Sequence, residues 1–99
     1  MRAIDAASMF AGKAKVKIWG VKQLDNLPVL IAERGRVALD NAIGKEAVQC
    51  ELKQRYEDYL LAQCVNSLDQ DLGLLMLQAG YVSVDRGVIY NSVFEEPYL

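Results

Sequence analysis

The chain has 99 residues, of which 53% are hydrophobic and 24% are charged, with a formal net charge of −2. This length suits a single domain, residues 1–99, with one core and no room for a separate catalytic domain. The composition excludes a disordered chain. The longest uninterrupted apolar run, residues 27–32, is far shorter than the roughly 20 residues that cross a bilayer, so we expect no membrane span.

The opening segment MRAIDAASMFAG does not have the pattern of a secretion signal. It contains one arginine, but Asp5 interrupts the apolar region and no convincing small-residue cleavage site follows. We therefore predict a cytoplasmic protein.

The chain contains two cysteines, Cys50 and Cys64, and no histidine. Both cysteines fall within a predicted helix over residues 45–65, which would hold them roughly 21 Å apart, so we expect no bond between them. Without histidine there is no zinc-ligand set and no Cys–His pair. The sequence predicts buried thiols, no metal site and no cofactor.

The first half of the chain predicts a helix, a strand and a second helix. Residues 1–12 suit a short helix ended by Gly12. Residues 14–19 predict a strand, because apolar residues alternate there with Lys13, Lys15 and Lys17. The next helix starts at Pro28, which is favoured in a first helical turn, and runs to Ile43.

The second half predicts two more helices. Residues 45–65 place apolar side chains at spacings of three and four: Val48, Leu52, Tyr56, Tyr59, Leu60 and Cys64. Residues 66–80 start with a capping box of Ser67 and Gln70 and end at Gly80. Because its apolar residues cover more than one stripe, we expect this last helix to be the most buried.

The stretch VSVDRGVIYN predicts a β-hairpin with a three-residue loop ending in Gly87. One face would carry Val82, Val84, Val88, Tyr90 and Phe94. The other face is also apolar, with Tyr81, Ile89 and Val93. Either the N-terminal segment covers this second face or it is an interface.

The fold class expected is α+β: a three-helix core with a small antiparallel sheet built from the C-terminal hairpin, which the N-terminal strand can join. The passage LLMLQAGYVSVDRGVIYN resembles the recognition helix and wing of a winged-helix DNA-binding domain, over about residues 54–92. That resemblance implies DNA binding through the last helix. However, residues 66–80 contain no Lys or Arg, so this face would repel a duplex and nucleic-acid binding is disfavoured.

The lysine row of Lys13, Lys15 and Lys17 has three interpretations. It can protect an edge strand from unwanted pairing, which we favour. It can contact phosphates, or it can meet Glu95 and Glu96 of a neighbouring copy.

Catalytic chemistry is poorly represented in the sequence. Neighbouring carboxylates occur, but none is linked to a nucleophile or to a phosphate-binding loop. The aromatic C-terminal segment NSVFEEPYL instead favours an interface. We expect a non-enzymatic protein-interaction module that self-associates, an accessory or structural subunit of a larger assembly, with a phage as one origin. The expected contact residues are Val88, Tyr90, Val93, Phe94 and Tyr98, with the lysine row as a secondary charged patch. A nucleic-acid-binding regulator is the alternative.

Overall fold

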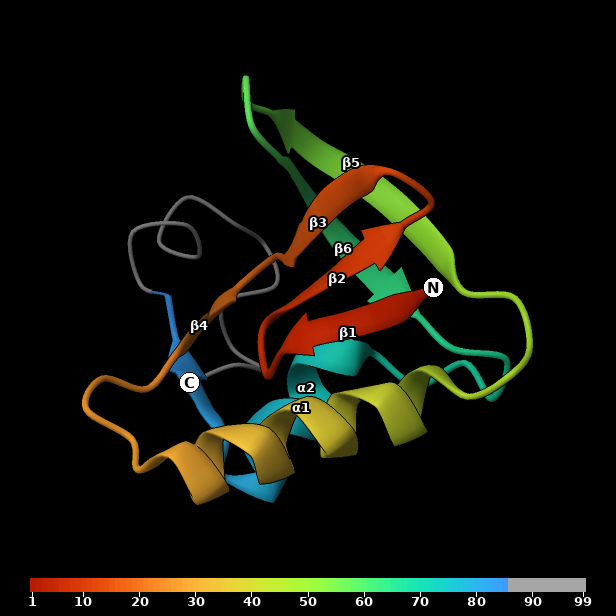
Figure 1. The fold of residues 1–99 in the computed structure, drawn as a ribbon. Helices are drawn as coiled ribbons and strands as arrows, with labels where there is room; N and C mark the ends of the chain where they lie inside the picture. Colours follow the sequence, from red (N-terminus) through yellow and green to blue (C-terminus); the bar gives the residue numbers. More distant parts are fainter. Residues whose placement is uncertain (86–99) are drawn as a thin grey trace.

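The computed structural model describes residues 1–85, which form a mostly β-sheet structure with two helices (Figure 1). Five strands form a curved sheet in the order β1-β2-β3-β6-β5, and β4 pairs with β7 in a second, two-stranded sheet. The elements are β1 Arg2–Asp5, β2 Ser8–Ala11, β3 Ala14–Ile18, β4 Val21–Gln23, α1 Val29–Ile43, β5 Gln49–Arg55, β6 Leu60–Val65, α2 Leu72–Ala79 and β7 Val82–Val84. The predicted three-helix core is therefore wrong, and the winged-helix resemblance fails with it.

The helix predicted over residues 1–12 is instead the hairpin of β1 and β2, with Ala3 opposite Met9. Asp5 explains the turn between these strands. Its Oδ1 accepts hydrogen bonds from the backbone N–H of Ala7 at 2.8 Å and from the hydroxyl of Ser8 at 2.7 Å. Such side-chain bonds to the following residues offer the backbone an alternative to a helix.

The helix predicted over residues 45–65 is the antiparallel hairpin of β5 and β6, and this error decided the fold class. A two-residue turn at positions 57–58 joins the strands, and the Tyr56 N–H donates to the Tyr59 carbonyl at 2.9 Å. β6 is also parallel to β3 on its other side. Its alternate residues Ala62 and Cys64 are buried, which is the period of a strand.

This hairpin also overturns the expectation for the cysteines. Cys50 and Cys64 are directly opposite each other on β5 and β6, with their Cα atoms 4.1 Å apart, and they form a disulfide. A helix would have separated them, whereas a hairpin brings them together.

Three expectations for individual elements are confirmed. β3 occupies the predicted strand, and α1 follows Pro28 and ends where Gly44 has φ of 69°. α2 ends at Gly80 in the left-handed conformation. However, α2 begins only at Leu72, because Asp71 rather than Ser67 caps it, with Oδ1 accepting from the Leu74 N–H at 3.0 Å.

The predicted C-terminal hairpin is described only in its first arm. β7 pairs antiparallel with β4, with Val84 opposite Val21. The second arm and the residues proposed as an interface (Val88, Tyr90, Val93, Phe94 and Tyr98) lie outside the described residues.

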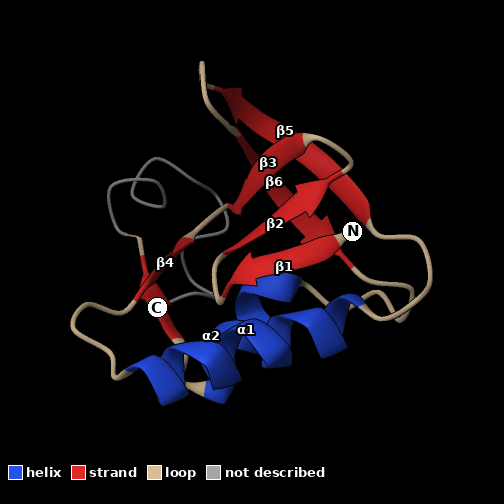
Figure 2. Ribbon diagram, in the orientation of Figure 1, coloured by secondary structure: helices blue, strands red, loops and turns tan. Residues whose placement is uncertain are grey.

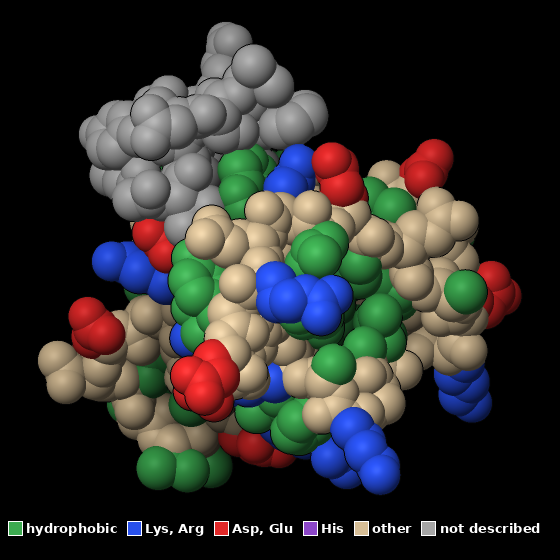
Figure 3. All heavy atoms as spheres, turned by 90° about the horizontal axis from the view of Figure 1, so that it is seen from above, with side chains coloured by type: hydrophobic (Ala, Val, Ile, Leu, Met, Phe, Trp, Pro, Cys, Tyr) green, Lys and Arg blue, Asp and Glu red, His purple; other side chains and the backbone are tan. Residues whose placement is uncertain are grey.

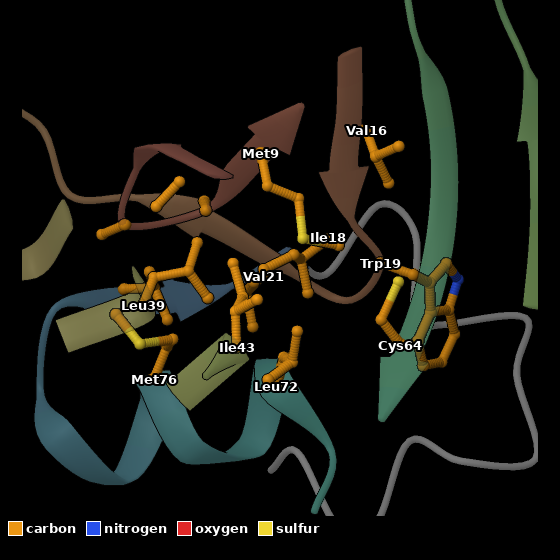
Figure 4. Packing of buried hydrophobic residues seen from close by; sticks show 14 of the residues in the cluster. Met9, Val16, Ile18, Trp19, Val21, Leu39, Ile43, Cys64, Leu72 and Met76 are labelled. Carbon is orange, nitrogen blue, oxygen red and sulfur yellow. The ribbon is translucent and has the colours of Figure 1, made fainter. Parts of the chain in front are cut away.

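Both helices lie on the same side of the five-stranded sheet and enclose the core against it (Figure 2). α1 packs on β1, whereas α2 packs on β6, β7 and α1. The side chains of Met9 and Ile18 point from the sheet toward Leu39, Leu72 and Met76 of the helices (Figure 4). No helix among residues 1–85 has the length and apolar character needed to cross a membrane.

The topology combines a three-stranded meander, a helix, and a hairpin whose second strand runs parallel to β3. This order is similar to that of the OB-fold, a curved five-stranded architecture with Greek-key connections.

Candidate functional site

A cleft of about 300 Å³ lies between the β1–β2 turn, β3, β4 and the β5–β6 turn. Its walls come from the β1–β2 turn, β3, β4, the β5–β6 turn, β6 and the residue after β7. The lining residues are Asp5, Ala7, Ser8, Lys17, Val21, Lys22, Gln23, Tyr56, Tyr59, Leu61 and Asp85. We call this site the main cleft.

Two tyrosines on either side of the β5–β6 turn form one wall of the main cleft. The rings of Tyr56 and Tyr59 are stacked, with centroids 4.6 Å apart and an angle of 22° between their planes. The turn places them together because it contains only two residues, Glu57 and Asp58. Tyr56 remains 41% exposed, so part of its ring is open to a ligand.

Lys17 brings a positive charge to this wall. Its ammonium group lies 4.3 Å from the centroid of the Tyr59 ring, a cation–π contact that fixes the charge beside the tyrosine pair. β3 places Lys17 here because Val16 and Ile18, its neighbours on the strand, are buried on the opposite face. Lys22 on β4 supplies a second cation to the cleft.

The carboxylates in the main cleft moderate its positive charge. Asp5 and Asp85 face the same space as Lys17 and Lys22. The Oδ1 atom of Asp5 is already occupied by the two hydrogen bonds that hold the β1–β2 turn. The Asp85 backbone N–H donates to Gly20 at 2.9 Å, which ties the end of β7 to the start of β4. Both residues therefore have a structural role at the rim.

A second, more open hollow lies on the other side of the tyrosine pair. It is lined by Lys13, Ala14, Lys15, Arg55, Tyr56, Glu57, Asp58, Tyr59 and Leu60. The main cleft and this second hollow share Tyr56 and Tyr59, so the two depressions are contiguous across the ring pair. Viewed from above, Lys and Arg atoms near the centre of the face lie among hydrophobic side chains, and both acidic and basic side chains lie around its edge (Figure 3).

The lysine row predicted from the sequence is divided between the two depressions. Lys13 and Lys15 line the second hollow, and Lys17 lines the main cleft. β3 pairs with β2 on one side and with β6 on the other. The prediction that the lysine row protects a sheet edge is therefore wrong.

Sequence reasoning missed several residues of this site. The sequence pattern assigns Tyr56 and Tyr59 to the inner face of a helix and gives Asp5 no role in a site. The signal was available in the segment Tyr-Glu-Asp-Tyr, where two aromatic residues flank a pair of turn-compatible acidic residues. Within residues 1–85, no three His, Cys, Asp or Glu side chains are grouped closely enough to hold a metal ion.

No protein-family model matches this chain, and no curated protein matches it.

Proposed function

We propose that this chain is a non-enzymatic binding domain and that the main cleft holds a segment of single-stranded nucleic acid. The observation that carries the proposal is the stacked tyrosine pair with Lys17 against it. Single-stranded nucleic acids are bound by aromatic rings that stack on bases, beside cations that contact the backbone. The OB-like strand order adds support, because that architecture binds oligonucleotides on its second and third strands, between the loops that follow the first and fourth strands. The main cleft is lined by the β1–β2 turn, β3 and the β5–β6 turn, which are among the corresponding elements.

The two contiguous depressions support a linear ligand rather than a compact one. A strand crossing the tyrosine pair would meet Lys17 and Lys22 on one side and Lys13, Lys15 and Arg55 on the other. The acidic face that argued against DNA binding belongs to residues 66–80, which do not line either depression. The carboxylates at the rims reduce the attraction, so we expect weak binding that falls steeply with salt.

Fluorescence anisotropy with a labelled oligothymidine tests this function. We expect binding at low salt, with log K falling by roughly 0.7 per phosphate contact for each unit of log salt. Tyr56→Ala should weaken binding roughly 5- to 150-fold, because one stacked base contributes about 1–3 kcal/mol. Lys17→Glu should also weaken it and reduce the salt slope.

Lys45→Glu is the matched control for charge, because Lys45 is exposed between α1 and β5, away from both depressions. It should leave binding almost unchanged. Equal losses for Lys17→Glu and Lys45→Glu would show that the oligonucleotide responds only to net charge, and the cleft would not be its site.

Self-association is the second candidate function, as expected from the sequence. The observation that favours it is the long strand β5 at the edge of the five-stranded sheet. A role as an accessory or structural subunit, and an origin in a phage, remain predictions.

The disulfide bears on the compartment. We propose an oxidising compartment in place of the cytoplasm, because disulfides are rare where glutathione and thioredoxin keep thiols reduced. Trapping free thiols with a maleimide in intact cells tests this. Labelling of both cysteines in the intact cells would indicate a reducing compartment and contradict this proposal.

A further inference from the structure

The outer edge of β5 is open in the part of the chain that the structure describes. β5 ends the sheet order β1-β2-β3-β6-β5 and, within residues 1–85, pairs only with β6. The 4.1 Å between the Cα atoms of Cys50 and Cys64 is the close spacing of a non-hydrogen-bonded pair, whose backbone groups point away from the partner strand. Cys50, and Leu52 two residues later, therefore direct their N–H and C=O groups to the open edge.

The side chain of Leu52 is also incompletely covered. It lies opposite Ala62, which is 3% exposed and belongs to the buried face of the sheet. Leu52 itself is 49% exposed. A further strand beside β5 would satisfy the free backbone groups and cover this side chain at the same time.

The charges along β5 are complementary to a second copy of the same strand running antiparallel. With Leu52 opposite Leu52 of the second copy, Glu51 is opposite Lys53. Glu51 and Lys53 share a face of β5, because their side chains already form an ion pair at 3.3 Å within one chain. In the paired strands Glu51 of each copy would face Lys53 of the other copy. The dimer would therefore contain this pair of opposite charges twice by symmetry.

We propose that the chain forms a two-fold symmetric dimer through antiparallel pairing of β5 edges about Leu52. This proposal supplies the surface for the self-association proposed above and is independent of the main cleft. The register shift between Leu52 and Gln54 limits the contact, because a bulge twists an edge strand away from a straight partner. The dimer is therefore small and depends on concentration.

Sedimentation velocity over roughly 10 µM to 1 mM tests the proposal, since a contact this small belongs to the weak class of interfaces. The wild-type mass should rise from 11.0 kDa toward twice that value. Glu51→Lys makes positions 51 and 53 both positive, and Lys53→Glu makes both negative. Each variant alone should weaken dimerisation by about tenfold or more, because like charges then face each other.

The decisive measurement is an equimolar mixture of these two variants. The positive pair at positions 51 and 53 of one variant then faces the negative pair of the other, and a heterodimer should form at the concentration where each variant alone is a monomer. Glu46→Lys, which makes the same charge change in the exposed segment before β5, is the matched control and should dimerise as the wild type does. Circular dichroism of each variant checks that the fold is kept.

Two outcomes would overturn the proposal in distinguishable ways. A wild-type monomer at every concentration would remove both the β5 dimer and self-association in general. If both charge reversals leave dimerisation unchanged, or if the mixed variants do not associate, then β5 is not the dimer surface. Self-association would then depend on another part of the chain.

Discussion

The disulfide between Cys50 and Cys64 should be a major contributor to the stability of this small domain. The two cysteines are 14 residues apart in sequence. In the chain-entropy treatment, a cross-link closing a loop of about 15 residues stabilises the fold by roughly 3 kcal/mol at 25 °C. For a domain of this size each kcal/mol corresponds to about 5 °C in melting temperature, so reduction should lower Tm by about 15 °C.

The assay is thermal unfolding followed by circular dichroism, with and without a phosphine reductant. Free thiols are counted in denaturant in the same samples. The oxidised protein should contain no free thiol and the reduced protein two. Cys50→Ser is the control, because its Tm should already be low and should not respond to the reductant. Cys50 is the suitable position because it is exposed, whereas Cys64 is buried in the core.

Two results would refute this reasoning. Two free thiols in protein purified under oxidising conditions would mean that the bond does not form. An unchanged Tm on reduction would mean that the β5–β6 hairpin needs no cross-link, because its strand pairing and its parallel contact with β3 suffice.

Three further substitutions test the packing and the turns. Gly35→Ala should destabilise the fold by about 1–2 kcal/mol in urea unfolding, because the added Cβ would lie 2.9 Å from the Ala6 Cβ and the cost of this overpacking exceeds the gain in helix propensity. A stabilised variant would contradict the close approach of α1 to the β1–β2 turn. Asn66→Ala should lower the free energy of unfolding by about 2–3 kcal/mol in the same assay, because this buried side chain donates to the Ala42 carbonyl and accepts from the Leu68 N–H. A loss below about 0.5 kcal/mol would be inconsistent with that network. Asp71→Ala should cost about 1 kcal/mol through loss of the α2 cap, whereas Asp71→Asn, which can also cap, should retain most of the stability; equal losses for the two would point to the charge rather than the cap.

The parts of the fold that the sequence determined are those with strong local signals. The alternation of lysines with Ala14, Val16 and Ile18 can only be satisfied by a strand with one buried face. Pro28 and Gly44 mark the two ends of α1 by backbone constraints that act without tertiary contacts, and Gly80 does the same for α2.

Tertiary structure decided the central hairpin and, with it, the candidate site. In residues 45–65 the apolar side chains satisfy a helical spacing as well as a strand, so the local pattern did not choose between them. The choice depends on β3, which offers β6 a parallel partner, and on Cys64, which reaches Cys50 only across a hairpin. These contacts join residues far apart in the sequence.

The same long-range pairing explains why the main cleft was not predicted. Lys17 is 42 residues from Tyr59 in the sequence, and their contact exists only because β3 and β6 are neighbours. The sequence contained both side chains and the charge pattern of β5. Only the fold determined which of them face one another, because hydrophobic burial selects the arrangement of whole elements and local propensity does not.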